Sequence, residues 1–238
     1  MPPLTTHAIV LRYANYRDND RMLTLFSPEL GRIDAAVRGV RKPKSALRGA
    51  AELFATGVYT LYQNQGRHTV TGCAVQDGFY PLRLSMDALN AGVYLLNLTE
   101  AAIQPGEGNE VLFYLLLRAL THLAYGDAPP KAVAAAYIVQ YALILGYKPR
   151  LQHCAVCGKR LPPEEAQAFS ISVGGVVCPA CAEGAEHVSP RQVAWMQAVV
   201  DEGIDAFSKA GEDVPFSLLS RFVAYRLERP IKSSALLG

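Results

Sequence analysis

The sequence predicts a mixed α+β protein with several domains, in which a small amino-terminal β-barrel precedes a helical domain with an inserted cysteine module. Three observations support this prediction. The first 80 residues contain short β-rich runs, residues after about 82 show helical spacing, and two Cys-x-x-Cys pairs interrupt the helical part. Half of the residues are apolar, which is enough for a sizeable core and excludes a disordered chain.

Five β-rich runs, separated by turn residues, occupy the amino-terminal region. They read HAIVLRY, RMLTLF, RIDAAVRGV, FATGVYTLYQ and HTVTGCAVQ. Five antiparallel strands in a segment of this length suit a closed barrel, because closure removes exposed strand edges. We therefore predict a five-stranded OB-fold barrel; the pattern also admits an SH3-like barrel or an open sheet. Cys73, inside the last run, is expected to be a buried thiol.

Helical spacing extends from residue 82 to near the carboxyl terminus. The expected helices cover 85–104, 110–126, 129–147, 189–207 and 215–228. Ser85 and Ser189 precede two of them as N-caps, and Gly126 and Gly146 lie near the ends of two others. The second and third are apolar almost all round, so we expect both at the centre of a bundle. Residues 229–238 read as a tail.

These segments predict a domain order in which the helical domain is discontinuous. Residues 1–80 form the barrel, 81–149 the first helical part, 150–186 the cysteine module, and 187–238 the second helical part with the tail.

Charge is unevenly distributed although the net charge is only +2. Residues 1–80 hold ten Lys and Arg against six Asp and Glu, whereas 81–238 hold thirteen against fifteen. The cations concentrate in one acid-free stretch, whose members are Arg38, Arg41, Lys42, Lys44 and Arg48. Flexible Lys and forked Arg side chains on a loop can follow a phosphate backbone without reading sequence. The stretch therefore predicts a nucleic-acid site; a solvated loop or an acidic protein partner are the alternatives.

Other side chains of the barrel would enlarge this site if they emerge on the same face. The cations concerned are Arg12, Arg17, Arg21 and Arg32. The aromatic candidates for base stacking are Tyr13, Tyr16, Phe54, Tyr59 and Tyr62. Strand residues alternate inward and outward, so we expect more of these aromatics in the core than on the surface.

Four of the five cysteines form two pairs, Cys154-x2-Cys157 and Cys178-x2-Cys181, separated by twenty residues. This spacing is typical of a four-thiolate zinc site. Such a site has no open position for water, so the metal would be structural. Two disulfides or a redox pair are the alternatives, and His153 offers a possible replacement ligand. A module this small has too little core of its own, and bound metal would contribute on the order of 10 kcal/mol to its folding.

Enzymatic motifs are missing from the sequence. It contains no GxxxxGK[ST], GxGxxG, GxSxG or HExxH pattern, which disfavours an ATP-driven or hydrolytic enzyme. A zinc-dependent enzyme would need a ligand other than thiolate. A scaffold that binds only proteins is the remaining alternative.

The sequence predicts a soluble cytoplasmic protein with no membrane segment. The first ten residues, MPPLTTHAIV, lack the pattern of a signal peptide. The longest weakly polar run, 132–147, would form a helix of about 24 Å, shorter than the bilayer core of about 30 Å.

Two long stretches carry a resemblance to a known family. AIVLRYANYRDNDRMLTLFSPELGRIDAAVRGVRKPKSALRGAAELF resembles the amino-terminal domain of RecO proteins, the bacterial recombination mediators. LGYKPRLQHCAVCGKR followed by VGGVVCPACA is similar to the zinc-carrying segment of that family. LYQNQGRHTV and YLLNLTEAAI lie between them in the expected order, so the resemblance covers nearly the whole chain.

The resemblance implies a protein without enzymatic activity that has an OB-fold, a helical domain and a structural zinc module. RecO-like proteins bind single- and double-stranded DNA and anneal complementary strands. They act with RecR to load the recombinase on DNA coated by single-strand binding protein, and they bind the acidic carboxyl-terminal tail of that coating protein. The resemblance places DNA contact on the stretch from Arg38 to Arg48. It does not place the RecR-binding or tail-binding residues on this sequence.

Overall fold

The computed structural model describes residues 3–210 and 213–237. Its contacts divide the chain into two compact units. The first comprises Met1–Pro81 and Leu96–Leu116, and the second comprises Leu82–Leu95 and Leu117–Gly238. Residues 96–116, which comprise the end of the first helix, the loop after it and the start of the second helix, therefore belong with the barrel.

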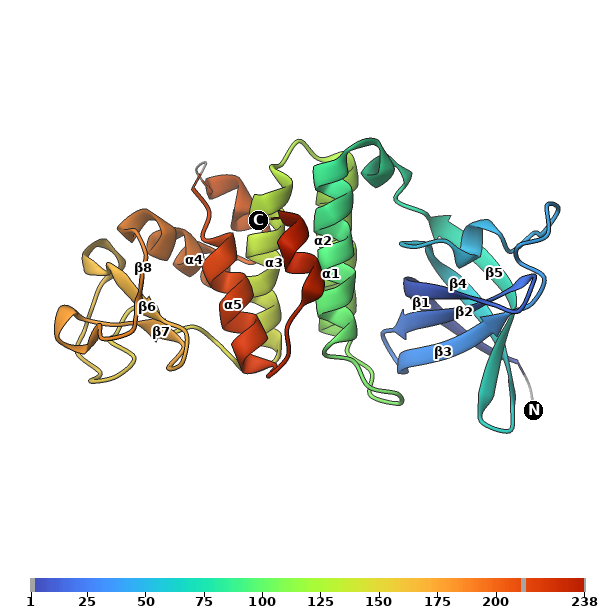
Figure 1. Cartoon of the computed structure of the whole chain (residues 1–238), viewed down its shortest axis with the longest axis horizontal. Coiled ribbons are helices and arrows are strands. Elements are labelled where there is room, and N and C mark those ends of the chain that lie inside the picture. Colours follow the sequence, from blue (N-terminus) through green and yellow to red (C-terminus); the bar gives the residue numbers. More distant parts are fainter. Residues whose placement is uncertain (1–2, 211–212, 238) are drawn as a thin grey trace. The chain divides into compact units, whose positions relative to one another are not determined.

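The first unit contains a closed five-stranded barrel with strand order β1-β2-β3-β5-β4 (Figure 1). The strands are β1 (Leu4–Tyr16), β2 (Asp20–Ser27), β3 (Gly31–Val37), β4 (Thr56–Asn64) and β5 (Arg67–Asp77). This arrangement confirms the predicted OB-like barrel. One feature of the prediction is wrong: β3 and β5 pair in parallel, not antiparallel. An odd number of strands cannot alternate direction all the way round a closed barrel, so one pair must be parallel.

The third strand ends at Val37, three residues before the end of the predicted run. Gly39 has a φ of +64°, in the left-handed region that favours glycine, and the chain turns there. Val40 then returns to the barrel and is buried. The basic stretch consequently starts at the rim of the barrel, immediately after β3.

Alternating side chains of the strands fill the barrel interior. The buried cluster includes Val10, Leu25, Ile33, Tyr59 and Leu61. The short 3-10 helix η1 (Gly49–Ala51) closes one side of this core with two buried alanines. The Tyr59 hydroxyl donates a hydrogen bond of 2.7 Å to the carbonyl of Ala50, so the buried phenol is satisfied and holds η1 in place.

A loop that follows the first helix packs tightly on the β2–β3 turn, within the first unit. Gly31 has a φ of +66°, and a Cβ there would lie 2.2 Å from the carbonyl oxygen of Gln104. A Cβ on Gly108 would lie 2.5 Å from the carbonyl oxygen of Glu29. Phe26 and Phe113 add an edge-to-face ring contact with centroids 5.5 Å apart. Only glycine permits this approach of two backbones.

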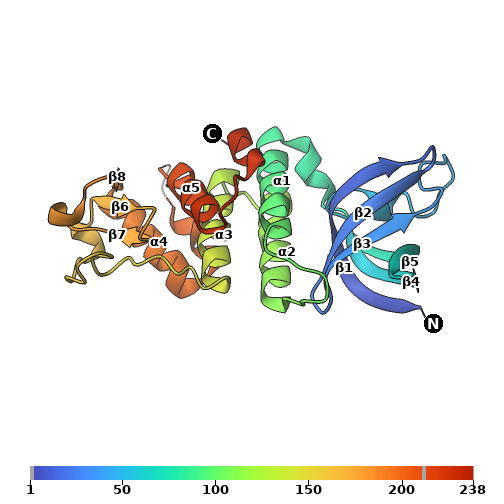
Figure 2. The ribbon, with the colours of Figure 1, turned by 60° about the horizontal axis from the view of Figure 1, so that its bottom comes forward.

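Five α-helices lie in the described part of the chain (Figure 2). They are α1 (Met86–Glu100), α2 (Glu110–Tyr125), α3 (Pro130–Ile144), α4 (Pro190–Glu202) and α5 (Phe216–Arg226). Ser85 and Ser189 act as predicted: the Ser85 hydroxyl accepts from the amide of Ala88, and Ser189 forms a capping box with Gln192. The predicted 189–207 helix ends at Gly203, and 3-10 helix η5 (Ile204–Lys209) follows.

The two strongly apolar helices differ from one another. Side chains of α3 are buried continuously from Ala132 to Val139, and this helix packs against α4 and α5. This confirms the predicted central position of α3. By contrast, α2 exposes Val111, Tyr114 and Tyr125 along one side, so the prediction for α2 is wrong. Exposed apolar residues at helical spacing are not visible in composition alone.

The expected tail is a folded segment as far as the structure describes it. Residues Lys232–Leu237 form the 3-10 helix η6, and Gly238 lies outside the described residues. Another 3-10 helix, η2 (Tyr80–Leu84), lies at the start of the helical part. Ile231 and Leu237 are buried. The prediction of a tail is therefore wrong for residues 231–237.

The cysteine segment forms a small sheet of order β7-β6-β8 in the second unit. Its strands are β6 (Ala168–Ser170), β7 (Gly175–Val176) and β8 (Glu186–His187), accompanied by 3-10 helices η3 (Pro163–Glu165) and η4 (Pro179–Cys181). The apolar core of this module is small, and the Phe169 ring packs edge-on against Phe222 of α5. Its buried members include Leu161, Ala166, Phe169, Val176 and Val177.

Among the residues that the structure describes, no helix is both long enough and apolar enough to span a bilayer.

Candidate nucleic-acid interface and metal centre

The basic stretch lies on the loop between β3 and η1, and its cations reach solvent. All five are exposed: Arg38, Arg41, Lys42, Lys44 and Arg48. Within residues 3–210 and 213–237, none of them forms an ion pair with a carboxylate. The positive charge of this loop is therefore available to an external anion.

Backbone hydrogen bonds and two apolar anchors give the loop a defined shape. Val40 is buried in the barrel core, and Leu47 packs partly buried against it. The Gly39 amide donates to Oδ1 of Asp20 at 2.8 Å, and the Arg41 amide donates to the carbonyl of Asn19 at 3.0 Å. Successive turns bring the chain back towards η1. The Arg41 guanidinium also donates to the carbonyl of Asp18 at 3.0 Å, so the loop is tied to the β1–β2 turn while its cationic side chains remain exposed.

A groove of about 600 Å³ opens beside this loop on the barrel. Three arginines from three different segments line it: Arg17 of the β1–β2 turn, Arg38 after β3, and Arg67 at the start of β5. Two carboxylates, Asp20 and Asp34, also line it. Asp20 already accepts the Gly39 amide, and Asp34 pairs with Arg32 at 3.1 Å. The charge of Asp34 is thus paired with Arg32, whereas the Gly39 amide leaves the charge of Asp20 in place. Three arginines against this one remaining carboxylate make the groove cationic.

Arg67 and His68 are groove residues that sequence reasoning did not single out. Arg67 ends the NQGR turn and His68 directly follows it, so neither residue lies in a cluster of charge. Their proximity to Arg38 depends on the parallel pairing of β3 with β5, in which Ala35 lies opposite His68. A sequence signal was available in the OB topology itself, since that topology makes the fifth strand a neighbour of the third.

Of the four cations predicted to extend the site, three are engaged within the first unit. Arg12 and Arg32 both pair with Glu100, at 3.3 and 3.9 Å. Arg21 pairs with Glu52 at 2.8 Å. Arg17 alone of the four is exposed without an ion pair among the described residues. The cationic surface is therefore narrower than the sequence predicts, and it centres on the loop and the groove.

The five aromatic candidates divide between the core and the surface. Phe54 and Tyr59 are fully buried, and burial raises the pKa of the Tyr59 hydroxyl. Tyr13, Tyr16 and Tyr62 are 37%, 45% and 46% exposed. Tyr16 lines the groove with Arg17, whose guanidinium lies 5.1 Å from the Tyr16 ring centroid. Tyr16 is consequently the aromatic side chain best placed for a base in the groove.

The four cysteines of the two pairs converge in the second unit. Their sulfur atoms all lie within 4.8 Å of one another, and none of them forms a disulfide. Sγ of Cys157 and Sγ of Cys178 are 3.8 Å apart. Zinc bound by thiolates at 2.3 Å in a tetrahedron would separate the sulfurs by about 3.8 Å. The cluster therefore has the donor set and the dimensions to hold one metal ion.

Local backbone turns present both pairs to this centre. The Gly158 amide donates to the Cys154 carbonyl at 2.9 Å, and Gly158 has a φ of +74°, so glycine lets the first pair close. The Cys181 amide donates to the Cys178 carbonyl at 2.8 Å after Pro179 opens η4. The Cys178 amide points to Sγ of Cys154 at 3.4 Å, as expected for a sulfur that carries negative charge.

The surroundings shift the pKa of two of the thiols, Cys154 and Cys181, in opposite directions. Burial raises the pKa of Cys154, but backbone amides of Cys157, Cys178 and Val156 outweigh this and lower it to about 6. The neighbouring sulfurs, Cys178 first, raise the pKa of Cys181 to about 12. Four thiolates this close would repel one another without a cation, and a metal ion removes that repulsion.

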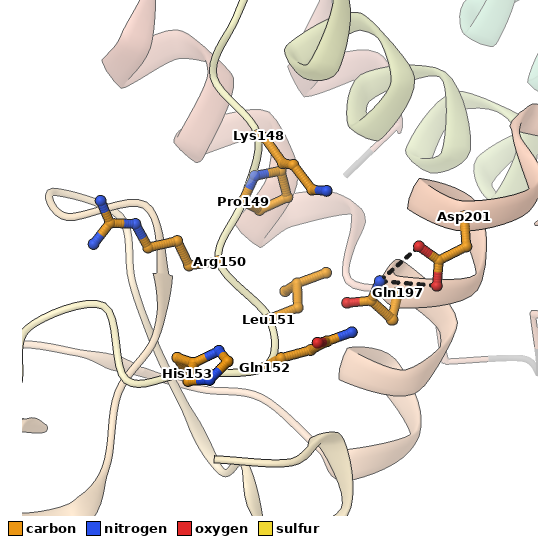
Figure 3. A pocket seen from close by; sticks show the side chains of 8 residues that line it. All are labelled: Lys148, Pro149, Arg150, Leu151, Gln152, His153, Gln197 and Asp201. Carbon is orange, nitrogen blue, oxygen red and sulfur yellow. Dashed lines mark hydrogen bonds between the residues drawn. The ribbon is translucent and has the colours of Figure 1, made fainter. Parts of the chain in front are cut away.

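His153 and Cys73 lie outside this centre. A shallow hollow runs beside residues 148–153 and α4, and His153 lines it (Figure 3). Across the hollow the Gln197 amide donates to both carboxylate oxygens of Asp201 at 2.9 Å. Cys73 is only half-buried, so the expectation of a buried thiol is met in part, and burial raises its pKa.

The fold and the two sites define a class of protein, namely one with an OB-like barrel that bears a cationic loop and a helical part that bears a four-cysteine centre. Two family models match the chain, "Recombination protein O N terminal" over residues 1–79 and "Recombination protein O C terminal" over residues 83–235. The chain belongs to the RecO family.

Curated relatives agree with this membership. The chain is 35% identical to "DNA repair protein RecO" of Pelotomaculum thermopropionicum, over 97% of its length and 91% of the relative's. It is 33% identical to the protein of the same name from Moorella thermoacetica, over 80% and 72%. A third such protein, from Roseiflexus sp., is 32% identical over 98% and 84%. This family is one of DNA repair proteins.

Proposed function

We propose that this RecO-family protein binds single- and double-stranded DNA, anneals complementary strands, and helps to load the recombinase onto DNA coated by single-strand binding protein. It does so without enzymatic activity. The observation that carries the proposal is the exposed loop from Arg38 to Arg48, whose five cations have no carboxylate partner among the described residues.

Electrostatics supply the mechanism for annealing. Two strands of DNA repel each other because both are polyanions. Lys and Arg side chains that neutralise phosphates release condensed counterions and lower this repulsion. The loop offers such cations on flexible stems, so it holds backbones without selecting a sequence. Unpaired bases that remain accessible can then find their complements.

The neighbouring groove favours contact with single strands in addition to phosphate contact. It combines three arginines with the half-exposed ring of Tyr16. A base can stack on this ring while its phosphates meet Arg17 and Arg38, which is the usual arrangement in single-strand binders. A duplex keeps its bases stacked inside, so it would use the loop alone.

The metal of the cysteine centre is proposed to be zinc in a structural role. Cys154, Cys157, Cys178 and Cys181 supply four sulfurs and leave no position for a substrate or water. The small sheet around them contains too few buried apolar residues to fold without this ion.

The protein is further proposed to bind two protein partners and to act in the cytoplasm. We place RecR and the acidic carboxyl-terminal tail of single-strand binding protein among the partners because the family resemblance implies them. The proposed site of action is the cytoplasm, where bacterial DNA is accessible.

The test is binding of a fluorescent oligo(dT) across a range of salt concentrations. If roughly five phosphates are contacted, log K should fall against log salt with a slope near −3.5 to −4.5. The double variant Arg41→Glu/Lys42→Glu should bind all sequences more weakly and with a shallower slope. Lys131→Glu/Arg191→Glu is the matched control, since both residues are exposed in the second unit and neither forms an ion pair among the described residues.

Equal losses in the two variants would remove the loop from the site. Failure of the parent protein to retain any single-stranded DNA at low salt would overturn the proposed function and favour a scaffold that binds only proteins.

A further inference from the structure

A second surface in the other unit combines aromatic rings with arginines. A hollow of about 800 Å³ is lined by residues from the end of α3, the β6–β7 turn and the end of α5. The members that matter are Tyr147, Tyr225, Arg226 and Arg229, which we call the α5 surface. It is distinct from the basic loop and from the cysteine centre.

The two tyrosine rings of the α5 surface are available to a ligand. Tyr225 is 54% exposed and Tyr147 is 39% exposed. Tyr147 has a fixed position, since Gly146 adopts a φ of +81° and the Tyr147 amide donates to the Ala142 carbonyl at 2.7 Å. Rings of this kind, rigid and half in solvent, serve as platforms for bases.

Arg226 is held by the cysteine module and by the rings beside it. Its Nη2 donates to the carbonyl of Ser172 at 3.1 Å, and its guanidinium lies 5.7 Å from the Tyr225 centroid. A Cβ on Gly174 would lie 2.3 Å from Nη2, so glycine at this position lets the guanidinium lie directly against the turn. Arg226 therefore keeps its charge next to Tyr225 without a carboxylate partner among the described residues.

Arg229 adds a second cation to the lining of the hollow. It is exposed, its amide donates to the Ala224 carbonyl at 3.2 Å, and it forms no ion pair within the part of the chain that the structure describes. One carboxylate, Glu228, also lines the hollow. The two guanidinium groups outnumber it, so the surface is cationic overall.

We propose that the α5 surface is a second binding site for single-stranded nucleic acid. Unpaired bases stack on Tyr225 and Tyr147, and the phosphates between them meet Arg226 and Arg229. The combination excludes duplex as the preferred ligand, because paired bases do not present their faces to a ring. This inference rests on the proposed function and deepens it: a protein that anneals strands needs a place for each of them.

Binding and photocrosslinking in the full chain test the proposal. The Tyr225→Ala/Arg229→Glu variant should bind oligo(dT) about tenfold more weakly than the parent, the size expected for one lost stacking contact. Its salt slope should be shallower by about 0.7, the value for one phosphate of a single strand. Arg226 is left intact because its carbonyl contacts support the fold. Tyr114→Ala/Arg191→Glu is the matched control, since it removes one exposed tyrosine and reverses one exposed arginine elsewhere.

Crosslinking avoids dependence on the variants. An oligo(dT) with 5-iodouracil, irradiated with the parent protein and mapped by mass spectrometry, should mark Tyr147 or Tyr225. Thermal melting checks that the variants fold.

The outcomes separate this inference from the proposed function. If the parent binds, the loop variant loses affinity, and Tyr225→Ala/Arg229→Glu matches its control without a crosslink at either tyrosine, then the α5 surface is not a nucleic-acid site and the proposed function stands. If that variant instead loses binding to an acidic peptide while it keeps DNA affinity, the surface is a protein site and the inference is overturned. If the parent binds no DNA, both fail.

Discussion

The amino-terminal barrel and the cysteine module are both β structures, yet they are held together by different means. The barrel closes a continuous hydrogen-bonded ladder of strands seven to thirteen residues long around a buried apolar cluster. The strands of the module have only two or three residues, and few side chains are buried between them. What replaces the core in the module is the group of four converging sulfurs.

The basic loop and the proposed α5 surface are therefore supported by structures of different kinds. The cationic loop is carried by a barrel whose stability comes from packing. The α5 surface depends in part on the module, because Arg226 donates a hydrogen bond to the β6–β7 turn. A substitution that disturbs packing in the barrel should therefore leave the cysteine module intact, and loss of the metal should leave the barrel intact.

The largest expected effect is loss of the module when one sulfur is removed. Cys157→Ser should abolish tight binding of one zinc per chain. The module should then lose on the order of several kcal/mol of the folding free energy that a structural zinc ion supplies. Hydrogen exchange should then speed up in residues 150–187 and stay slow in the barrel. Metal analysis and exchange mass spectrometry measure both results.

Cys73→Ser is the control for this change, because Cys73 lies in β5 and belongs to the barrel. It should leave the zinc content at one. Retention of stoichiometric zinc by Cys157→Ser would show that three sulfurs suffice and that the module is less dependent on the fourth.

The next effect belongs to the barrel and has no metal component. Gly31→Ala should lower the free energy of unfolding by about 2–3 kcal/mol, because its Cβ would meet the Gln104 carbonyl oxygen at 2.2 Å in a left-handed conformation. Urea unfolding measures this loss. Gly66→Ala has a similar φ of +74° with nothing within 4 Å, so it should cost only about 1 kcal/mol. Equal costs would mean that the turn can shift away from its neighbour.

A smaller effect is expected at the boundary between the module and α4. Ser189→Ala removes the capping box with Gln192 and should cost about 1 kcal/mol. Because the cap lies outside the sulfur cluster, zinc content should stay unchanged while the melting temperature falls. Ser189→Asp, which can also cap, should restore the stability. A loss of zinc in the alanine variant would show that the helix start and the metal centre are coupled.

The smallest effect concerns pH in the second unit. Burial raises the pKa of Asp205, but hydrogen bonds from Arg118 and His122 outweigh it, so the pKa lies below the ordinary value of 3.8. A carboxylate whose pKa is lowered by folding stabilises the protein above its ordinary pKa, and this contribution is lost as the pH falls below it. Asp205→Asn should therefore lower stability by a few tenths of a kcal/mol at pH 7, since the side chain is about half exposed.

Chemical denaturation of Asp205→Asn and parent at pH 7 and pH 3 measures the difference. The difference in stability between the two proteins should be smaller at pH 3 than at pH 7. A constant difference across this range would assign the effect to packing.

Local patterns in the sequence predicted most of the strands and helices. The features that they did not predict depend on how distant segments pack together. Alternation and turn residues were enough to predict five strands, and Ser85, Ser189 and the glycines marked helix ends. The parallel β3–β5 pairing is a consequence of closure, which no local run encodes. Whether a side of α2 is exposed and whether Ile231 is buried depend on residues far away in the sequence. The predictions of a central α2 and of a carboxyl-terminal tail were therefore wrong.

The sites were predictable to the extent that their residues are neighbours in sequence. The basic loop and the two cysteine pairs are contiguous signals, and the convergence of the four sulfurs agrees with their spacing. Arg67 was not predicted as a site residue, because only the pairing of β3 with β5 brings it to the same groove as Arg38. The ion pairs of Arg12 and Arg32 with Glu100 were equally invisible, since Glu100 follows more than sixty residues later.

The close approach of Gly31 and Gly108 to each other's loops has a consequence for how the chain is made. The β2–β3 turn is synthesised early, but the backbone that covers it leaves the ribosome only some seventy residues later. Until then the nascent barrel has an uncovered turn and an uncovered Phe26 ring. A gene truncated after codon 80 would leave that surface permanently bare, so we expect the isolated barrel to be prone to aggregation and to proteolysis.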